Sequence, residues 1–187
     1  EKGSGDRSFY SDNEYKEVGA HIVERSKLIS DADLLVSINA LSSDEYKKLN
    51  IHQAVLTAYG PLFNKDLLNQ FVSDGITSFS MDMVPRITRA QSMDILSSMA
   101  TISGYKAVLD AAINLPRFFP MFMTAAGTIR PSKILILGAG VAGLQAIATA
   151  RKLGAVVEAF DVRSEVKEQV ESLGGRFVEV EGSKENE

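Results

Sequence analysis

One stretch, residues 133–163, restricts the fold more than any other part of the sequence. Four apolar residues at 134–137 predict a buried parallel strand, and an apolar pattern of helical period follows them. Between the two stand Gly138, Gly140 and Gly143, in the spacing GxGxxG. In such a loop the first glycine permits a tight turn, the second lets the backbone approach a pyrophosphate, and the third lets the helix pack closely on the strand. The stretch therefore predicts a dinucleotide site.

Asp161 completes this pattern at the end of a second apolar strand, expected over residues 155–160. A carboxylate about 20 residues beyond the glycines is suited to accept both hydroxyls of the adenosine ribose. Because it would repel a 2′-phosphate, it favours NAD(H) over NADP(H). Arg163 could accommodate such a phosphate, but we expect it in the first turn of a helix, pointing to solvent or to the adenine edge. The predicted cofactor-binding residues are Gly138, Ala139, Gly140, Val141, Ala142, Gly143, Asp161, Val162 and Arg163.

The composition excludes several classes of function. The chain has 187 residues, 45% of them apolar and 24% charged, which is typical of a globular protein. A net charge of −4 gives no reason to expect nucleic acid as a partner. With no cysteine and only His21 and His52 as imidazole ligands, zinc chemistry is not expected, and both histidines are expected to be structural or at the surface. No apolar run approaches the ~20 residues of a membrane-spanning helix.

The first half of the chain alternates predicted strands with predicted helices. A helix is expected from Asp12 or Asn13, either of which could cap it, towards Val18. Further helices are expected at 42–48 and from Asn64 to Gly75. The strands are expected at 34–38, 54–58 and 76–80. Such alternation predicts a parallel sheet covered on both faces, hence a three-layer domain.

The second half begins with a pattern that predicts one long helix, from Thr88 until Pro116 forbids it. Residues 116–131 are rich in Phe and Met, and we expect an apolar connector that packs against the following sheet and fills core volume. A helix over 164–173 and a further strand over 176–180 are expected next. The polar tail, 181–187, is expected to be solvated.

The predicted fold class is α/β, with two Rossmann-like three-layer α/β/α lobes that contain parallel sheets and are joined by a long helix. We assign residues 1–87 to the N-terminal lobe, 88–130 to the linking helix and connector, and 131–187 to the first half of the dinucleotide-binding lobe. Because such a fold needs two βαβαβ halves, both lobes are expected to be incomplete, as in a fragment of a longer protein.

Four segments carry a resemblance to a known family. They read PRITRAQSMDILSS, GYKAVLDAA, FPMFMTAAGTIRP and GAGVAGLQAIATARKLGAVVEAFDVR, and the run KEQVESLGG strengthens them. With these segments the chain resembles the NAD(H)-binding domain I of proton-translocating nicotinamide nucleotide transhydrogenase, the alpha subunit in bacteria. That family resembles alanine dehydrogenase in fold, with two α/β lobes flanking a cleft, but the alanine enzyme lacks the RAQSMD segment.

The resemblance implies a catalytic role at the nicotinamide end for Arg86, Gln91, Asp94 and Ser97. Arg86 and Asp94 would hold the carboxamide and its ribose and pyrophosphate neighbourhood, Gln91 would face the partner nucleotide, and Ser97 would bond the carboxamide. Hydride transfer needs no acid or base from the protein, only two rings held face to face with water excluded. From spacing alone, Gln91, Asp94 and Ser97 could equally form a solvated or capping face of one helix.

By the same resemblance, NADH on this chain would pass a hydride to NADP⁺ on a partner domain III, and a membrane domain II would couple the step to proton translocation. A homodimer is implied, as is a parent protein at a bacterial inner or mitochondrial-type membrane, with this domain on the soluble face. The isolated fragment would bind NAD(H) weakly or not at all and would not catalyse the hydride transfer. The alternatives are an NAD-dependent amino-acid dehydrogenase of the alanine dehydrogenase type, which should need a histidine and a lysine at its substrate, and a nucleotide-binding module without chemistry.

Overall fold

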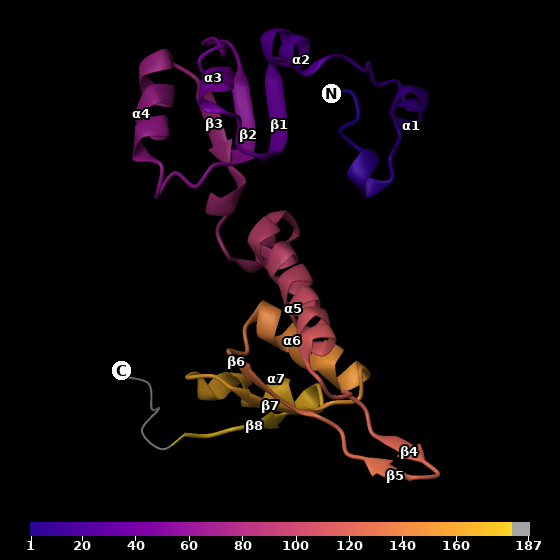
Figure 1. Ribbon diagram of the computed structural model, residues 1–187. Coiled ribbons are helices and arrows are strands. Elements are labelled where there is room, and N and C mark those ends of the chain that lie inside the picture. Colours follow the sequence, from indigo (N-terminus) through magenta and orange to yellow (C-terminus); the bar gives the residue numbers. More distant parts are fainter. Residues whose placement is uncertain (181–187) are drawn as a thin grey trace. The chain divides into compact units, whose positions relative to one another are not determined.

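The computed structural model describes residues 1–180, so the tail expected at 181–187 lies outside the described residues (Figure 1). Contacts between residues divide the chain into two compact units, Glu1–Asp94 and Ile95–Glu187. The long helix and the connector therefore group with the second unit.

The first unit contains a parallel sheet in the order β1-β2-β3. Its strands are β1 (Leu34–Asn39), β2 (Ala54–Ala58) and β3 (Thr77–Ser80), so the three predicted strands are confirmed to within one residue at each end. Ala54 is the register partner of both Leu34 and Thr77. Parallel pairing follows from the helices that connect the strands, as the alternation of elements predicts.

Four helices accompany this sheet: α1 (Asp12–Glu17), α2 (Arg25–Asp31), α3 (Ser43–Tyr46) and α4 (Lys65–Asp74). The expected cap of α1 was wrong, because Ser11 caps the helix in a capping box with Glu14. The short α2 was not predicted, since it offers few apolar residues and has no side-chain cap. The unit also contains three 3₁₀ turns, Asp6–Ser8, Met81–Met83 and Thr88–Met93.

The core of the first unit is built around Phe71 of α4, which is 2% exposed. The rings of Tyr46 and Tyr59 meet it edge to face, with centroids 5.0 and 5.4 Å away. Leu35 and Val55 reach the same cluster from β1 and β2. Alternate residues of a strand point to opposite faces, and Leu34, Val36 and Ile38 are accordingly exposed.

The single long helix expected from Thr88 was wrong. Residues Thr88–Met93 form a 3₁₀ turn, and the α-helix α5 begins only at Ile95 and ends at Asn114. Asp94 separates them with φ −78° and ψ 89°, outside the helical region. Gln91, Asp94 and Ser97 therefore do not share one face of a continuous helix.

The second unit contains a parallel sheet in the order β6-β7-β8, formed by Lys133–Leu137, Val156–Phe160 and Arg176–Phe177. Helix α6 (Val141–Lys152) connects the first two strands. The helix expected over 164–173 consists of a 3₁₀ turn, Ser164–Val166, and α7, Lys167–Ser172. The core gathers around Ile147, Ala150 and Val170, which are fully buried.

Helix α5 packs closely on α6. Gly104 marks the crossing, because a Cβ at that position would stand 2.1 Å from the carbonyl oxygen of Ala142. No helix within residues 1–180 is long and apolar enough to cross a membrane.

The connector forms an antiparallel hairpin, β4 (Phe122–Thr124) with β5 (Gly127–Ile129), and the expectation that it packs into the core was wrong. Phe122, Met123 and Ile129 are 43%, 77% and 43% exposed, and only Phe119 ahead of the hairpin is buried in the core. Ladder hydrogen bonds satisfy the backbone of a hairpin, so it can leave the sheet while its apolar side chains remain accessible.

The predicted α/β class with parallel sheets is confirmed. Within residues 1–180, each of the two parallel sheets packs helices on one face and exposes apolar side chains on the other, so the described residues do not supply the helices that a three-layer lobe places on the second face. In the second unit Leu135 and Leu137 are 57% and 75% exposed.

Candidate dinucleotide site

The turn from β6 to α6 has the backbone that the glycine spacing predicts. Gly138 adopts φ +95°, a conformation that residues with a Cβ rarely adopt, and its N–H donates to the carbonyl of Phe160 at 2.7 Å. Gly140 caps α6 with extended backbone, and its carbonyl accepts from Leu144 N–H at 2.8 Å. The chain thus leaves the carboxyl end of a parallel strand and enters a helix within three residues.

The three glycines meet different surroundings. A Cβ at Gly143 would stand 1.8 Å from the carbonyl oxygen of Gly138, so the approach of helix to strand requires glycine. A Cβ at Gly138 or Gly140 would meet no protein atom within 4 Å. The first turn of α6, including Val141 and Ala142, belongs to the helix end whose N–H groups and positive dipole suit a phosphate. The loop therefore fits a dinucleotide pyrophosphate, with open space above Gly140.

Asp161 lies beside this loop because β7 pairs with β6 in register, with Leu137 opposite Phe160. Its carboxylate is 7% exposed and accepts the Ala139 N–H at Oδ2, 2.7 Å away. The Arg163 guanidinium, and after it the backbone N–H groups of Arg163 and Ala139, hold the pKa of the Asp161 carboxyl well below its usual range against the effect of burial. The carboxylate is therefore ionised at neutral pH and fixed at the glycine loop.

Arg163 does not simply point to solvent. It precedes the 3₁₀ turn Ser164–Val166, and its side chain, 50% exposed, turns back to Asp161. Nε donates to Oδ1 and Nη2 to Oδ2, both at 3.1 Å. Val162 between them is 61% exposed. This pair was not predicted, and its only trace in the sequence is a basic residue two positions after the acidic one.

The four residues predicted to act at the nicotinamide end belong to different parts of the chain. Arg86 lies in the loop before the turn Thr88–Met93, and Gln91 lies within that turn; both are exposed. Asp94 is buried, at 7% exposure. Ser97, half-buried in the first turns of α5, belongs to the second unit together with the glycine loop, whereas the other three belong to the first. Their common role stays a prediction.

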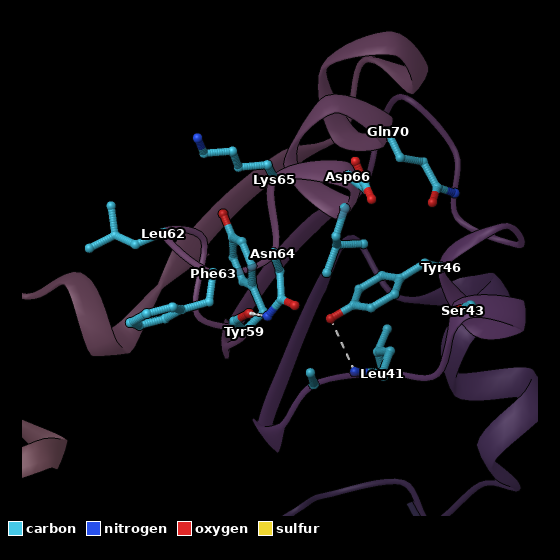
Figure 2. A pocket seen from close by; sticks show the side chains of 12 residues that line it. Leu41, Ser43, Tyr46, Tyr59, Leu62, Phe63, Asn64, Lys65, Asp66 and Gln70 are labelled. Carbon is cyan, nitrogen blue, oxygen red and sulfur yellow. Dashed lines mark hydrogen bonds between the residues drawn. The ribbon is translucent and has the colours of Figure 1, made fainter.

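A separate cavity of about 740 Å³ lies in the first unit, beyond the carboxyl ends of β1 and β2. Figure 2 shows Tyr46, Tyr59, Asn64 and Lys65 among the side chains that line it, with the Tyr46 hydroxyl accepting the Leu41 N–H at 3.1 Å. Burial raises the pKa of Tyr46, so its hydroxyl is neutral. None of the four residues predicted at the nicotinamide end lines this cavity, and sequence reasoning did not identify it.

Comparison with family models divides the chain into two matched segments. Residues 1–103 match the model described as "Alanine dehydrogenase/PNT, N-terminal domain", and residues 107–187 match "Alanine dehydrogenase/PNT, C-terminal domain". The chain belongs to the alanine dehydrogenase/PNT family. This confirms the resemblance drawn from the RAQSMD segment and the glycine loop, and it agrees with the Rossmann-like fold.

Within the alanine dehydrogenase/PNT family, transhydrogenase subunits are more similar to the chain than the alanine dehydrogenases with which it was compared. NAD(P) transhydrogenase subunit alpha of Cereibacter sphaeroides is 46% identical over 97% of the chain and 35% of the relative. The same subunit of Haemophilus influenzae is 42% identical over 99% of the chain and 36% of the relative. The alanine dehydrogenase of Mycolicibacterium smegmatis is 27% identical over 94% of the chain and 48% of the relative. The chain thus spans less than half of the length of these relatives.

Comparison with solved structures gives the same order of similarity. A transhydrogenase from Sinorhizobium meliloti superimposes with a TM-score of 0.91 and 47% identity, over 97% of this chain and 52% of that one. An L-alanine dehydrogenase superimposes with a TM-score of 0.79 at 24% identity, over 94% of this chain and 50% of that one, which supports the shared fold alone.

Proposed function

We propose that this chain is the NAD(H)-binding component of a proton-translocating nicotinamide nucleotide transhydrogenase. The observation that carries the proposal is the conjunction of the RAQSMD segment with a glycine loop that fits a dinucleotide. The identity of 42–46% to relatives named NAD(P) transhydrogenase subunit alpha supports it. The runner-up, an alanine dehydrogenase, has relatives at 27–29%.

In this proposal the glycine loop and the first turn of α6 bind the pyrophosphate through backbone N–H groups. Asp161 accepts the hydroxyls of the adenosine ribose, and the ionised state of its carboxyl favours NAD(H). Arg86, Gln91, Asp94 and Ser97 act at the nicotinamide end, where they orient the carboxamide. When bound, NADH supplies a hydride to NADP⁺ held on a partner domain. The side chains of this chain bind and orient, and none of them needs to exchange a proton.

The partners in this proposal are an NADP(H)-binding domain III, a membrane domain II that couples the transfer to proton translocation, and a second copy of this chain. Support for the homodimer comes from the hairpin β4–β5, whose sequence MFMTAAGTI at 121–129 is uncharged and largely exposed. An apolar surface without charge fits another copy of itself better than water. If this surface forms the dimer, Met123→Glu is expected to sediment as a monomer. The control Thr128→Ser is expected to sediment as a dimer, like the original protein.

The proposal is tested by mixing a longer subunit that contains this chain with an NADP(H)-binding domain III. Transfer between NADH and a thio-analogue of NADP⁺ is followed by absorbance. We expect transfer that is reduced at least tenfold by Gln91→Ala, with NADH binding retained. The matched control, Gln145→Ala on α6, is expected to leave transfer unchanged. Binding of NADH without any transfer would favour the non-catalytic module instead.

The alanine dehydrogenase alternative has a separate test. Such an enzyme should place a histidine and a lysine at its substrate, and the described lining of the first unit's cavity offers Lys65 but no histidine. We therefore expect no oxidation of NADH that depends on pyruvate and ammonia. Measurable turnover of those substrates would revive the alternative.

A further inference from the structure

Hydrogen-bond donors occupy all acceptor positions of the Asp161 carboxylate, and three of these donors belong to Arg163. Four donors reach it: the backbone N–H of Ala139 at 2.7 Å, the backbone N–H of Arg163 at 2.9 Å, and Nε and Nη2 of Arg163 at 3.1 Å each. An ionised carboxylate has about four lone-pair positions, so every one has a donor. A ribose that brings two hydroxyl donors must displace some of them.

The four donors are not equally replaceable. The two backbone N–H groups are fixed, because Ala139 is 1% exposed within the glycine loop and the Arg163 N–H is set by the chain itself. The guanidinium is carried by a long side chain that is 50% exposed, against 7% for the Asp161 side chain. Water can solvate this exposed guanidinium when it leaves the carboxylate, whereas the two backbone N–H groups cannot move away, so the guanidinium is the donor that can leave.

We propose that Arg163 is a positioning and specificity-determining residue. Its bidentate ion pair fixes the Asp161 carboxylate, and a bound ribose displaces the guanidinium from that carboxylate. This inference rests on the proposed function, since it requires a dinucleotide at the glycine loop. While paired, the two side chains present no net charge to the 2′ position. Once displaced, the guanidinium stays within reach of that position and is a fork-shaped donor suited to phosphate. Arg163 therefore makes the ratio of affinities for NAD(H) over NADP(H) smaller than the ratio that Asp161 alone would produce.

The test compares ADP-ribose with 2′-phospho-ADP-ribose by titration of a ¹⁵N-labelled longer subunit that contains this chain, with the amides of the glycine loop as reporters. These two ligands differ only in the 2′-phosphate, and chemical-shift titration tolerates weak binding. Arg163→Leu is expected to increase the preference for ADP-ribose by about tenfold, the value of one charge-assisted hydrogen bond to phosphate. Arg163→Lys, which keeps the charge without the fork, is expected to restore part of the original ratio.

Arg176→Leu is the matched control. Arg176 pairs with Glu158 at 2.8 Å on the same sheet, so its loss changes the net charge by the same amount without touching Asp161. The ratio of the two affinities is expected to stay within about twofold of the original. An equal ratio in the original chain and in Arg163→Leu would overturn the role of Arg163 while leaving the proposed cofactor site intact.

A second measurement needs no ligand. The ¹³C signal of the Asp161 carboxyl should show ionisation down to the lowest pH at which the fold persists, and Arg163→Leu should raise the pKa of this carboxyl, because its first cause of depression is removed. Arg176→Leu should leave it in place. If the pKa of Asp161 were unchanged in Arg163→Leu, the ion pair between Arg163 and Asp161 would be refuted. Failure of both ligands to move the loop amides of the unsubstituted longer subunit would instead overturn the proposed cofactor site, and with it the specificity role.

Discussion

Gly143 lies so close to Gly138 that a Cβ at position 143 would stand 1.8 Å from the Gly138 carbonyl oxygen. A Cβ is fixed to the backbone and the Gly138 oxygen is a backbone atom, so no rotation of a side chain could relieve the clash. The contact fixes the start of α6 on the end of β6, and thereby the direction in which the first N–H groups of the helix point. Stability of the second unit and geometry of the candidate phosphate site depend on the same glycine.

Gly143→Ala is expected to lower the free energy of unfolding of the second unit by about 1–3 kcal/mol, the usual range for forced overpacking. Thermal unfolding measures this loss. Gly140→Ala is the control, because its Cβ would meet no protein atom within 4 Å and its φ is −78°. Gly140→Ala should keep the fold and weaken NADH binding, since the new methyl group enters the space proposed for the pyrophosphate. Unimpaired NADH binding by this control would contradict the proposed position of the phosphates.

Gly104→Ala tests the crossing of α5 and α6. A Cβ at Gly104 would stand 2.1 Å from the Ala142 carbonyl oxygen, so the two helices must separate to accept it. The gain of about 1 kcal/mol in helix propensity does not offset such overpacking, and we expect a net loss of about 1–3 kcal/mol with faster hydrogen exchange in both helices. Ser103→Ala, at the exposed neighbouring position, should be neutral or slightly stabilising. Equal stability of the two variants would show that the crossing is not tight.

The strands and the glycine loop were predictable because their causes are local. A buried parallel strand is an uninterrupted apolar run, as in 134–137, and the turn at Gly138 requires its φ of +95° whatever surrounds it. The position of Asp161 beside the loop follows from the parallel pairing of two such strands. The geometry of the glycine loop and the place of Asp161 beside it were therefore predictable from the sequence, whereas their binding of the adenosine half of a cofactor stays a prediction.

The predictions were wrong or incomplete where the conformation depends on contacts with distant parts of the chain. A 3₁₀ turn and an α-helix have similar apolar spacing, so the break at Asp94 left no mark in the periodicity of Thr88 onwards. The hairpin β4–β5 turns at Ala125 and Ala126, without the Asn-Gly or Gly-containing pair that signals a two-residue loop. The grip of Arg163 on Asp161 depends on a rotamer of a long side chain, which no sequence pattern specifies.

Thr57→Val is expected to stabilise the first unit. Thr57 of β2 is 0% exposed, and its Oγ1 finds no hydrogen-bond partner among the described residues. Replacement by a residue of the same shape removes an unpaired buried hydroxyl and should add about 1 kcal/mol to the free energy of unfolding. Urea unfolding followed by the near-ultraviolet signal of the buried Tyr46 and Tyr59 measures it. Thr57→Ser, which keeps the hydroxyl and loses the methyl group, should be less stable than the original chain.

The first unit should lose stability in acid through Glu45. This carboxylate accepts from Arg25 Nε at 2.5 Å and Nη2 at 3.2 Å, and it also accepts the Ser42 N–H at 2.8 Å in the capping box of α3. The Arg25 guanidinium, followed by the Ser42 N–H, lowers the pKa of Glu45 from 4.5 to about 2. A carboxyl whose pKa is lower in the folded state contributes stability above its unfolded pKa, and this contribution is lost as pH falls through the folded value.

The contribution of Glu45 should therefore be complete above pH 4.5 and disappear between pH 4.5 and about 2. Because the Arg25 side chain is 44% exposed, we expect no more than about 1 kcal/mol from the pair. In urea unfolding at pH 6, Glu45→Gln should be less stable than the original chain by that amount, and the difference should vanish near pH 2. Asp44→Asn, whose pair with Lys47 has an 87% exposed carboxylate, should change stability at pH 6 by less than about 0.5 kcal/mol. A difference between Glu45→Gln and the original chain that stays constant from pH 6 to pH 2 would show that the stability of α3 does not depend on the charge of Glu45.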